Sequence, residues 1–299
     1  MSAQRSDIAD EGQADRLPDR LRADGVTIGY DARVISADLS VDIPDNEFTV
    51  IIGPNACGKS TLLRSLARML SPSAGTILLD GRAISSYPSK EVARRLGLLP
   101  QSSVAPDGIT VADLVARGRY PHQKLLRQWS RTDEEIVGEA LAATNVADLA
   151  DRSVDELSGG QRQRVWIAMA LAQETGVLLL DEPTTFLDVT HQIEVLDLLT
   201  DLNRASGTTI VMVLHDVNLA ARYADHIFAL REGRLIASGA PGDVLTRTLI
   251  RDVYELDSLV IPDPVSGAPM VLPRGRHHVR DAAFAITPLP PTDPTEQAG

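Results

Sequence analysis

Short apolar runs alternate with helical patterns along most of the chain. The runs typical of strands lie at 26–30, 34–43, 48–52, 76–80, 96–99, 177–181 and 209–214. Helical patterns occupy 59–70 and 190–203. The runs at 177–181 and 209–214 are nearly continuous in apolar residues, as expected when helices cover both faces of a sheet. This alternation predicts an α/β fold with a βαβ arrangement and a largely parallel sheet.

The stretch 102–157 has a different pattern. It contains helical periodicity at 110–117 and 132–144 and little that is typical of a strand. We therefore predict a helical subdomain inserted at about 102–157. Beyond about residue 240, one more helical pattern is followed by a hairpin around 262–272.

The two ends of the chain differ from the middle in composition. Residues 1–22 are polar without periodicity, and residues 285–299 are rich in Pro and Thr. Such segments bury too little apolar surface to fold alone, so we expect a disordered lead and a disordered tail. Between them we expect a main domain at 23–255 and a C-terminal extension at 256–284.

A glycine-containing loop separates the apolar run at 48–52 from the helical pattern at 59–70. It matches the phosphate-loop pattern G-x-x-x-x-G-K-[ST] through Gly53, Pro54, Asn55, Ala56, Cys57, Gly58, Lys59 and Ser60, with Thr61 next. Glycines let successive N–H groups point inward, and these groups cradle phosphates at a helix N-terminus. We expect Lys59 to reach the β- and γ-phosphates of a nucleoside triphosphate and Ser60 to ligate its Mg²⁺.

Two positions inside this loop need comment. Ala56 stands where many such loops have Gly, and its methyl group is tolerable if the residue keeps a negative φ. The Cys57 thiolate could be favoured by the surrounding N–H groups and the helix dipole, and alkylation would then block nucleotide binding. The alternative is that Cys57 is a small side chain that fills space.

The apolar run at 177–181 ends in two acids, Asp181 and Glu182. A parallel strand places them beside the phosphate loop, where Asp181 can hold Mg²⁺ through water. Glu182 can then orient or deprotonate the attacking water. The following Pro183-Thr184 and the spacing of 122 positions from Lys59 (181 − 59) make this interpretation more specific.

The pentapeptide Leu157-Ser158-Gly159-Gly160-Gln161 is the most informative motif in the chain. Ser158 can cap the helical pattern at 162–172. Gly159 and Gly160 expose backbone N–H groups at the same helix end, which makes a second anion site. Two such sites in one chain need one triphosphate each, or one triphosphate that they share.

This pentapeptide resembles the LSGGQ signature of the ABC ATPases, and the motifs between about 24 and 255 follow the order of that family. In the family, the signature of one subunit closes over the ATP that is bound in the phosphate loop of another. The resemblance implies an ATP hydrolase with a P-loop NTPase core, a small antiparallel β-subdomain and the inserted helical subdomain. ATP and Mg²⁺ are the implied cofactors.

The resemblance also implies roles for single residues. Tyr30 matches the aromatic residue that stacks on adenine, and Gln101 matches the glutamine that senses Mg²⁺ and the membrane subunit. Asp188, after Leu187, matches the loop that contacts the second subunit, and His215 matches the histidine at the γ-phosphate. The implied catalytic residues are thus Lys59, Gln101, Glu182 and His215. The implied metal-binding residues are Ser60, Gln101 and Asp181, and Ser158, Gly159, Gly160, Gln161 and Asp188 complete the nucleotide site.

The chain has one phosphate loop and one signature. Because each site in the family combines the loop of one subunit with the signature of another, the resemblance implies a homodimer. Stretches 114–122, 162–173, 184–192, 263–267 and 275–278 resemble the ATPases of ferric-siderophore, haem and vitamin B12 importers. This implies two membrane-spanning permease subunits and, indirectly, an extracytoplasmic substrate-binding protein. Ferric siderophores are the expected cargo. Vitamin B12, haem or another metal cargo, and a soluble ABC ATPase without a transport role, are the alternatives.

Composition and charge restrict the partners further. A net charge of −12 and a pI of about 4.9 disfavour nucleic acid. The basic cluster Arg274, Arg276, His277, His278 and Arg280 is interpreted as a solvated segment, and its two histidines lack the ligand spacing of a metal site. The single cysteine excludes an intrachain disulfide. No apolar run approaches the ~18 residues of a membrane span, so the chain is not expected to cross a membrane by itself. The resemblance to importer ATPases implies a peripheral subunit at the cytoplasmic face of the cell (inner) membrane.

Overall fold

The computed structural model describes residues 20–31, 33–101, 104–123, 129–185, 187–275 and 277. The central sheet of this part of the chain follows the spatial order β10 (Arg234–Gly239), β9 (His226–Arg231), β3 (Phe48–Ile52), β8 (Thr209–Val213), β7 (Val177–Asp181) and β6 (Leu96–Leu99). All neighbours pair in parallel except β10, which pairs antiparallel with β9. The α/β fold and the largely parallel sheet are thus confirmed.

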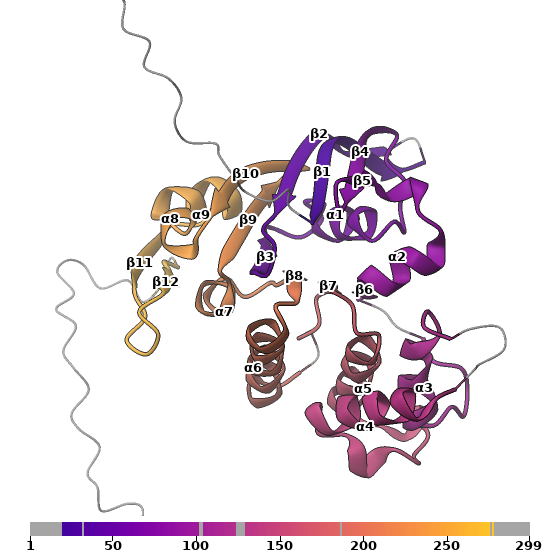
Figure 1. Cartoon of the computed structure of the whole chain (residues 1–299). Coiled ribbons are helices and arrows are strands. Elements are labelled where there is room, and N and C mark those ends of the chain that lie inside the picture. Colours follow the sequence, from indigo (N-terminus) through magenta and orange to yellow (C-terminus); the bar gives the residue numbers. More distant parts are fainter. Residues whose placement is uncertain are drawn as a thin grey trace, which may run out of the picture.

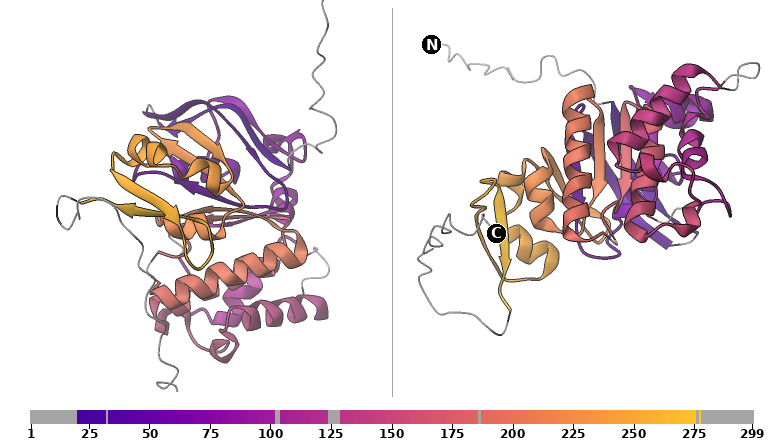
Figure 2. Two further views of the ribbon diagram at one scale, coloured as in Figure 1. Left: turned by 90° about the vertical axis from the view of Figure 1, so that its left-hand side faces the viewer. Right: turned by 90° about the horizontal axis from the view of Figure 1, so that it is seen from below.

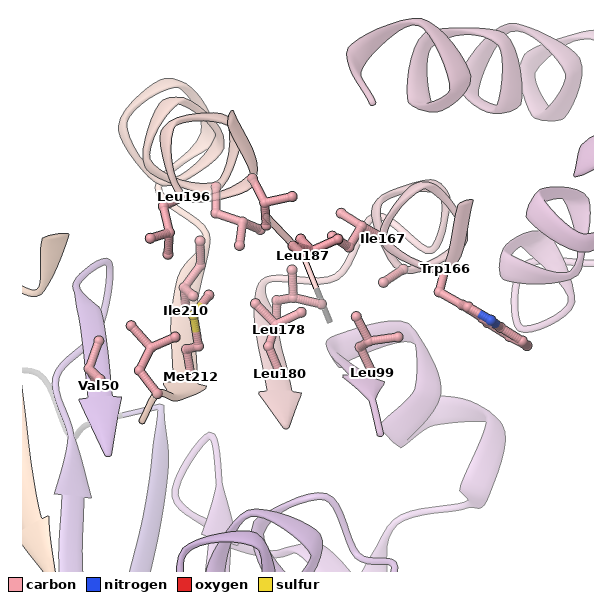
Figure 3. Packing of buried hydrophobic residues seen from close by; sticks show 14 of the residues in the cluster. Val50, Leu99, Trp166, Ile167, Leu178, Leu180, Leu187, Leu196, Ile210 and Met212 are labelled. Carbon is pink, nitrogen blue, oxygen red and sulfur yellow. The ribbon is translucent and has the colours of Figure 1, made fainter. Parts of the chain in front are cut away.

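Both faces of this sheet are buried, which explains the continuous apolar runs. Alternate residues of the strands face opposite ways. Val50, Leu178 and Ile210 pack on the side of α5 (Gly159–Ala172) and α6 (Val189–Ser206), as Figure 3 shows. Their strand neighbours, such as Ile51 and Leu179, pack on the other side with α1 (Lys59–Leu66).

A second, antiparallel sheet covers the far side of α1. Its order is β2 (Arg33–Ile43), β1 (Leu21–Tyr30), β4 (Ala74–Leu79) and β5 (Arg82–Ala83). Leu21 is fully buried and pairs with both Ile43 and Leu79. The expected lead therefore reaches too far at 22, because the strand already begins at Leu21; residues 1–19 of that lead lie outside the described residues.

The helical part of the chain contains α3 (Val111–Ala116), α4 (Arg131–Ala143) and α5, which pack on one another. It therefore extends past residue 157 and includes the helix after the signature. The buried guanidinium of Arg119 joins its parts, because it donates to Asp133 and to the carbonyl of Ala172, each at 2.8 Å. In Figure 1 these helices form a lobe apart from α1 and the antiparallel sheet.

The remaining helices and strands lie between the strands of the central sheet in sequence or after them. Helix α2 (Ser89–Arg95) precedes β6, and α7 (Val217–Tyr223) follows β8. The C-terminal elements are α8 (Pro241–Val244), α9 (Arg247–Tyr254) and the antiparallel hairpin of β11 (Ser258–Pro262) and β12 (Pro269–Pro273), where a hairpin is expected. Short 3₁₀ turns occur at Ile84–Ser86, Arg117–Arg119, Ala147–Leu149 and Val154–Glu156.

The hairpin lies at the end of the molecule opposite α3 and α4, as the right-hand view of Figure 2 shows. Strands β9 and β10 were not anticipated from the sequence. Among the described residues, no helix combines the length and the apolar character that crossing a membrane requires. The expected tail at 285–299 and the residues Phe186, Arg276, His278 and Arg280 lie outside the described part.

Candidate functional site

The sequence motifs meet at one edge of the central sheet. Strands β3, β6, β7 and β8 are parallel, so their carboxyl ends reach this edge together. The phosphate loop follows β3, Gln101 comes shortly after β6, Asp181 ends β7, and His215 comes shortly after β8. Ligands of open α/β sheets bind at this edge, so the topology indicates a binding site here.

The loop between β3 and α1 has a backbone that glycine is needed to form. Gly53 has a φ of 149°, and a Cβ atom there would lie 2.2 Å from the carbonyl oxygen of Leu230. Gly58 has a φ of 106° and is the N-cap of α1. Ala56 has a φ of 61°, so the condition of a negative φ, under which the methyl group would be tolerated without strain, is not met. The inward-facing loop requires a left-handed residue at this position, and the methyl group is accommodated at a cost in strain.

Lys59 is the first residue of α1 and is 5% exposed. Its ammonium donates to the carbonyl oxygens of Gly53 at 2.8 Å and Pro54 at 2.9 Å. A buried cation needs such partners, because an unpaired charge in the interior is costly. The lysine is therefore held inside the loop, where the phosphates of a nucleotide would be its stronger, anionic partners.

Ser60 and Asp181 form the residue pair expected for Mg²⁺. The Ser60 hydroxyl donates to Asp181 Oδ1 at 2.8 Å. Asp181 is 1% exposed, and this burial raises the pKa of its carboxyl group. Its Oδ2 atom is buried without a hydrogen bond from any described residue, with Arg64 Nε at 3.9 Å. A carboxylate oxygen with free lone pairs beside a hydroxyl suits a hard cation, so these residues fit Mg²⁺.

Glu182 is the most constrained side chain of the site. His215 Nε2 lies 2.7 Å from Glu182 Oε1, and Gln101 Nε2 donates to Oε2 at 2.7 Å. Thr185 Oγ1 donates to the same oxygen at 3.3 Å. The backbone of Glu182 has a φ of 54°, an uncommon value for a residue with a side chain. Strain of this kind is retained where the surroundings hold a residue in place, and it is found at functional sites.

An open cavity of about 260 Å³ lies over these groups. Its described lining residues are Arg33, Ile35, Asn55, Ala56, Gly58, Lys59, Ser60, Thr61, Glu182 and His215. Arg33 and Ile35 come from β2 and were missed in the sequence, because no motif marks them. The antiparallel sheet therefore supplies one wall of the cavity.

Tyr30 and Cys57 are not among the residues that line this cavity. Tyr30 is 43% exposed, and its hydroxyl accepts from Arg64 Nη1 at 3.3 Å. Arg64, which no sequence motif marks, thus stands between Tyr30 and Asp181. Cys57 is buried within the loop, and this burial raises the pKa of its thiol. Burial and the direction of that shift favour the space-filling role for Cys57 over the reactive thiolate.

The signature residues are not among those that line the cavity. Ser158 caps α5 and forms a reciprocal capping box with Gln161, whose side chain accepts from the Ser158 N–H at 3.1 Å. Ser158 and Gly159 are exposed, and Gly160 is half-buried. Asp188 caps α6 and accepts from the His191 N–H at 2.9 Å and from the His191 ring Nδ1 at 2.7 Å. The chain thus has a second helix N-terminus open to solvent, apart from the phosphate loop.

The family described as ABC transporter matches residues 36–185, which span the phosphate loop, the signature and the two acids. The chain belongs to the ABC transporter family. ATP hydrolysis is the activity that ABC ATPases share.

Curated relatives and solved structures agree with this assignment. The chain is 57% identical over 257 residues to the ferric enterobactin transport ATP-binding protein FepC of Escherichia coli (strain K12), covering 86% of this chain and 95% of FepC. It is 54% identical over 251 residues to the petrobactin import ATP-binding protein FpuD of Bacillus anthracis, covering 84% and 92%. Both relatives are similar to this ABC ATPase over nearly their whole length.

A solved ABC ATPase structure is similar at the level of the fold. The ATP-binding cassette MJ0796, in a dimeric post-hydrolysis state bound to ADP and Pi, matches with a TM-score of 0.66 and 26% identity. The match covers 74% of this chain and 98% of that cassette. The P-loop core, the antiparallel sheet and the helical lobe of this chain therefore form an ABC ATPase fold.

Proposed function

We propose that this chain hydrolyses MgATP as the motor subunit of an ABC importer. The observation that carries the proposal is the position of Glu182, whose carboxylate is held by His215 and Gln101 beside the cavity that Lys59 and Ser60 line. A fixed carboxylate next to a phosphate cradle is the arrangement needed to orient an attacking water.

In the proposed reaction, the triphosphate lies along the loop from Gly53 to Thr61. Backbone N–H groups and the Lys59 ammonium bind its β- and γ-phosphates. Ser60 and Asp181 would hold Mg²⁺, with Gln101 near it, and the ion would neutralise charge that develops on the phosphate oxygens. Glu182 orients the water in line with the γ-phosphate, and His215 donates to the γ-phosphate.

We propose that two copies of the chain share each nucleotide in a head-to-tail homodimer. The exposed N-terminus of α5 at Ser158 does not line the cavity, so it is a helix end at which a nucleotide bound to another copy could be held. A second copy can bring this helix end to the γ-phosphate, with Asp188 at the contact. The dimeric arrangement of the similar cassette MJ0796 supports this assembly.

We propose two permease subunits as the membrane partners, which would place the chain at the cytoplasmic face of the inner membrane. A groove of about 430 Å³ on the helical lobe supports this. It is lined by Ile109, Asp113, Ala116, Arg117, Tyr120, Gln123 and Trp129. Its two aromatic side chains are exposed, and aromatic residues are enriched where proteins bind partners.

Ferric siderophores are the proposed cargo, by similarity to FepC, whose name states ferric enterobactin transport, and to FpuD, whose name states petrobactin import. A substrate-binding protein outside the membrane would act with the permeases without touching this chain. The ATPase does not contact cargo, so its own residues cannot select it.

The function is tested at two levels. Purified wild-type chain should release phosphate from MgATP, and absence of release would contradict the ATPase. A strain that lacks the gene should lose growth on a ferric siderophore as sole iron source and regain it with the wild-type gene but not with Glu182→Gln. Growth loss on haem or vitamin B12 instead would reassign the cargo, and unchanged growth on all of them would favour a soluble ABC ATPase without a transport role.

A further inference from the structure

His215 is followed almost immediately by a helix. Asp216 caps α7, because its Oδ1 accepts from the N–H groups of Asn218 at 2.8 Å and Leu219 at 3.0 Å. On the other side, the N–H of Leu214 donates to Ile51 of the central sheet at 3.3 Å. The main chain around His215 is therefore set by the sheet before it and by α7 after it.

The C-terminal hairpin holds α7 through Asn218. The side chain of Asn218 exchanges two hydrogen bonds with the main chain of Val271 on β12. Nδ2 donates to the Val271 carbonyl at 3.2 Å, and the Val271 N–H donates to Oδ1 at 2.7 Å. An amide side chain that pairs in this way acts like a further strand residue. The first turn of α7 is thus fixed to the outer strand of the hairpin.

A second contact lies one turn along the same helix. Arg222 donates to Asp263 Oδ2 from Nε at 3.2 Å and from Nη2 at 2.6 Å. Asp263 also accepts from the Val265 N–H at 2.9 Å and the Ser266 hydroxyl at 2.8 Å. The hydrogen bond from Val265, followed by those from Arg222 and Ser266, lowers the pKa of Asp263. The turn of the hairpin and the last turn of α7 therefore form one ordered unit.

His215 itself is 45% exposed on its side chain, so packing alone does not determine its direction. Its position depends on the main chain and on the contact with Glu182. We propose that the β11–β12 hairpin, acting through Asn218 and Arg222 on α7, positions His215 for ATP hydrolysis. These two are positioning residues: neither lines the cavity, and each acts on the reaction through the histidine. The inference rests on the proposed function.

The matched control lies in the same C-terminal region. Arg247 of α9 donates to Asp257 Oδ1 from Nε at 3.0 Å and from Nη2 at 2.7 Å, which is nearly the geometry of the Arg222 pair. That pair does not involve α7. Arg247→Ala therefore removes an arginine–aspartate pair of similar geometry, at a more exposed place, without touching α7.

The experiment compares Asn218→Ala, Arg222→Ala and Arg247→Ala in the full chain. We measure kcat with MgATP, the Kd for ATP, the melting temperature, and the ring resonances of His215, assigned by their loss in His215→Ala. Displacing a reacting group by a fraction of an ångström slows a reaction by roughly 10-fold or more. The Asn218 and Arg222 variants should lose about that much kcat, keep the Kd within roughly 2-fold and shift the His215 resonances. Arg247→Ala should leave kcat, the Kd and the His215 resonances at their wild-type values.

The other outcomes are decisive as well. If both α7 variants lower the melting temperature but leave kcat and the His215 resonances at wild-type values, the hairpin has only a structural role. If either alanine variant does not fold, Arg222→Lys keeps the charge while losing the two-nitrogen contact, and the same readouts apply. If the wild type does not hydrolyse ATP, the proposed function fails. The His215 resonances then still report whether the hairpin positions the histidine.

Discussion

His215 and Glu182 meet through a contact of 2.7 Å between the imidazole Nε2 and the carboxylate Oε1. The two residues follow β8 and β7, which are parallel neighbours in the central sheet. Gln101, which follows β6 on the other side of β7, holds the second oxygen of the same carboxylate. Three adjacent strands thus determine where the carboxylate lies before any nucleotide arrives.

This arrangement predicts the effect of Glu182→Gln. The amide keeps the shape but loses the basic oxygen, so phosphate release should fall by about 10²- to 10⁴-fold, the usual contribution of a general base. ATP affinity should stay near that of the wild type, because Lys59 and the loop bind the phosphates. Glu139→Gln, on the exposed face of α4, is the control and should keep full activity. A Glu182→Gln rate above one tenth of wild type would contradict the assignment.

The left-handed backbone of Ala56 predicts that its replacement by glycine stabilises the folded chain. A left-handed backbone costs a non-glycine residue roughly 1–2 kcal/mol. Glycine loses more conformational entropy on folding, which costs roughly 0.5–1 kcal/mol and offsets part of that gain. Ala56→Gly should therefore raise the free energy of unfolding without nucleotide by up to about 1 kcal/mol. Ala142→Gly, on the exposed side of α4, should lower it by about 1 kcal/mol. Denaturant unfolding of both variants provides the measurement, and equal losses would show that Ala56 is unstrained.

The raised pKa of Asp181 predicts how Mg²⁺ binding depends on pH. Below its pKa the carboxyl group is neutral and cannot assist a cation. The Mg²⁺-dependent part of the ATP affinity should therefore fall as the pH drops through this pKa, above the usual aspartate value of about 3.9. ATP binding measured in a chelator should lack this fall, as should Asp181→Asn. A wild-type profile that is flat down to the ordinary aspartate range would contradict the prediction.

Stability without nucleotide should respond to pH in the opposite sense. The folded chain binds the Asp181 proton more tightly than the unfolded chain, since its folded pKa is raised. This contribution to stability is complete below the unfolded pKa and is lost as the pH rises through the folded pKa. The site thus gives up some stability at neutral pH in order to keep a charged carboxylate for the metal.

The local motifs could be predicted because each is a short run whose backbone chemistry is self-contained. Gly53 to Thr61 must form an anion cradle after a strand, and Ser158 with Gln161 must cap a helix. The Glu182–His215–Gln101 contact could not be derived from spacing, because the residues are far apart in sequence and only the order of the strands joins them. Here the family resemblance supplied the roles.

Other parts were missed for identifiable physical reasons. Strand β10 alternates exposed and half-buried residues at the edge of the sheet, so it lacks the fully apolar run seen in β7. The left-handed backbone of Ala56 could not be predicted, because the φ of a loop residue depends on the whole turn. Arg33 of β2 and Arg64 of α1 also lie at the site. Neither belongs to a motif, so nothing in the sequence distinguishes them from other arginines.

In the proposed dimer, each nucleotide site combines the phosphate loop of one copy with the signature of another. Lys59→Ala should be inactive because it cannot bind the phosphates, and Ser158→Arg because it blocks the helix end. In a mixed dimer, the intact loop of the Ser158→Arg chain faces the intact signature of the Lys59→Ala chain. Phosphate release by an equal mixture should therefore recover to about one quarter of wild type, since about half the dimers are mixed and each has one good site. A mixture as inactive as its two components, at every ratio, would contradict the account.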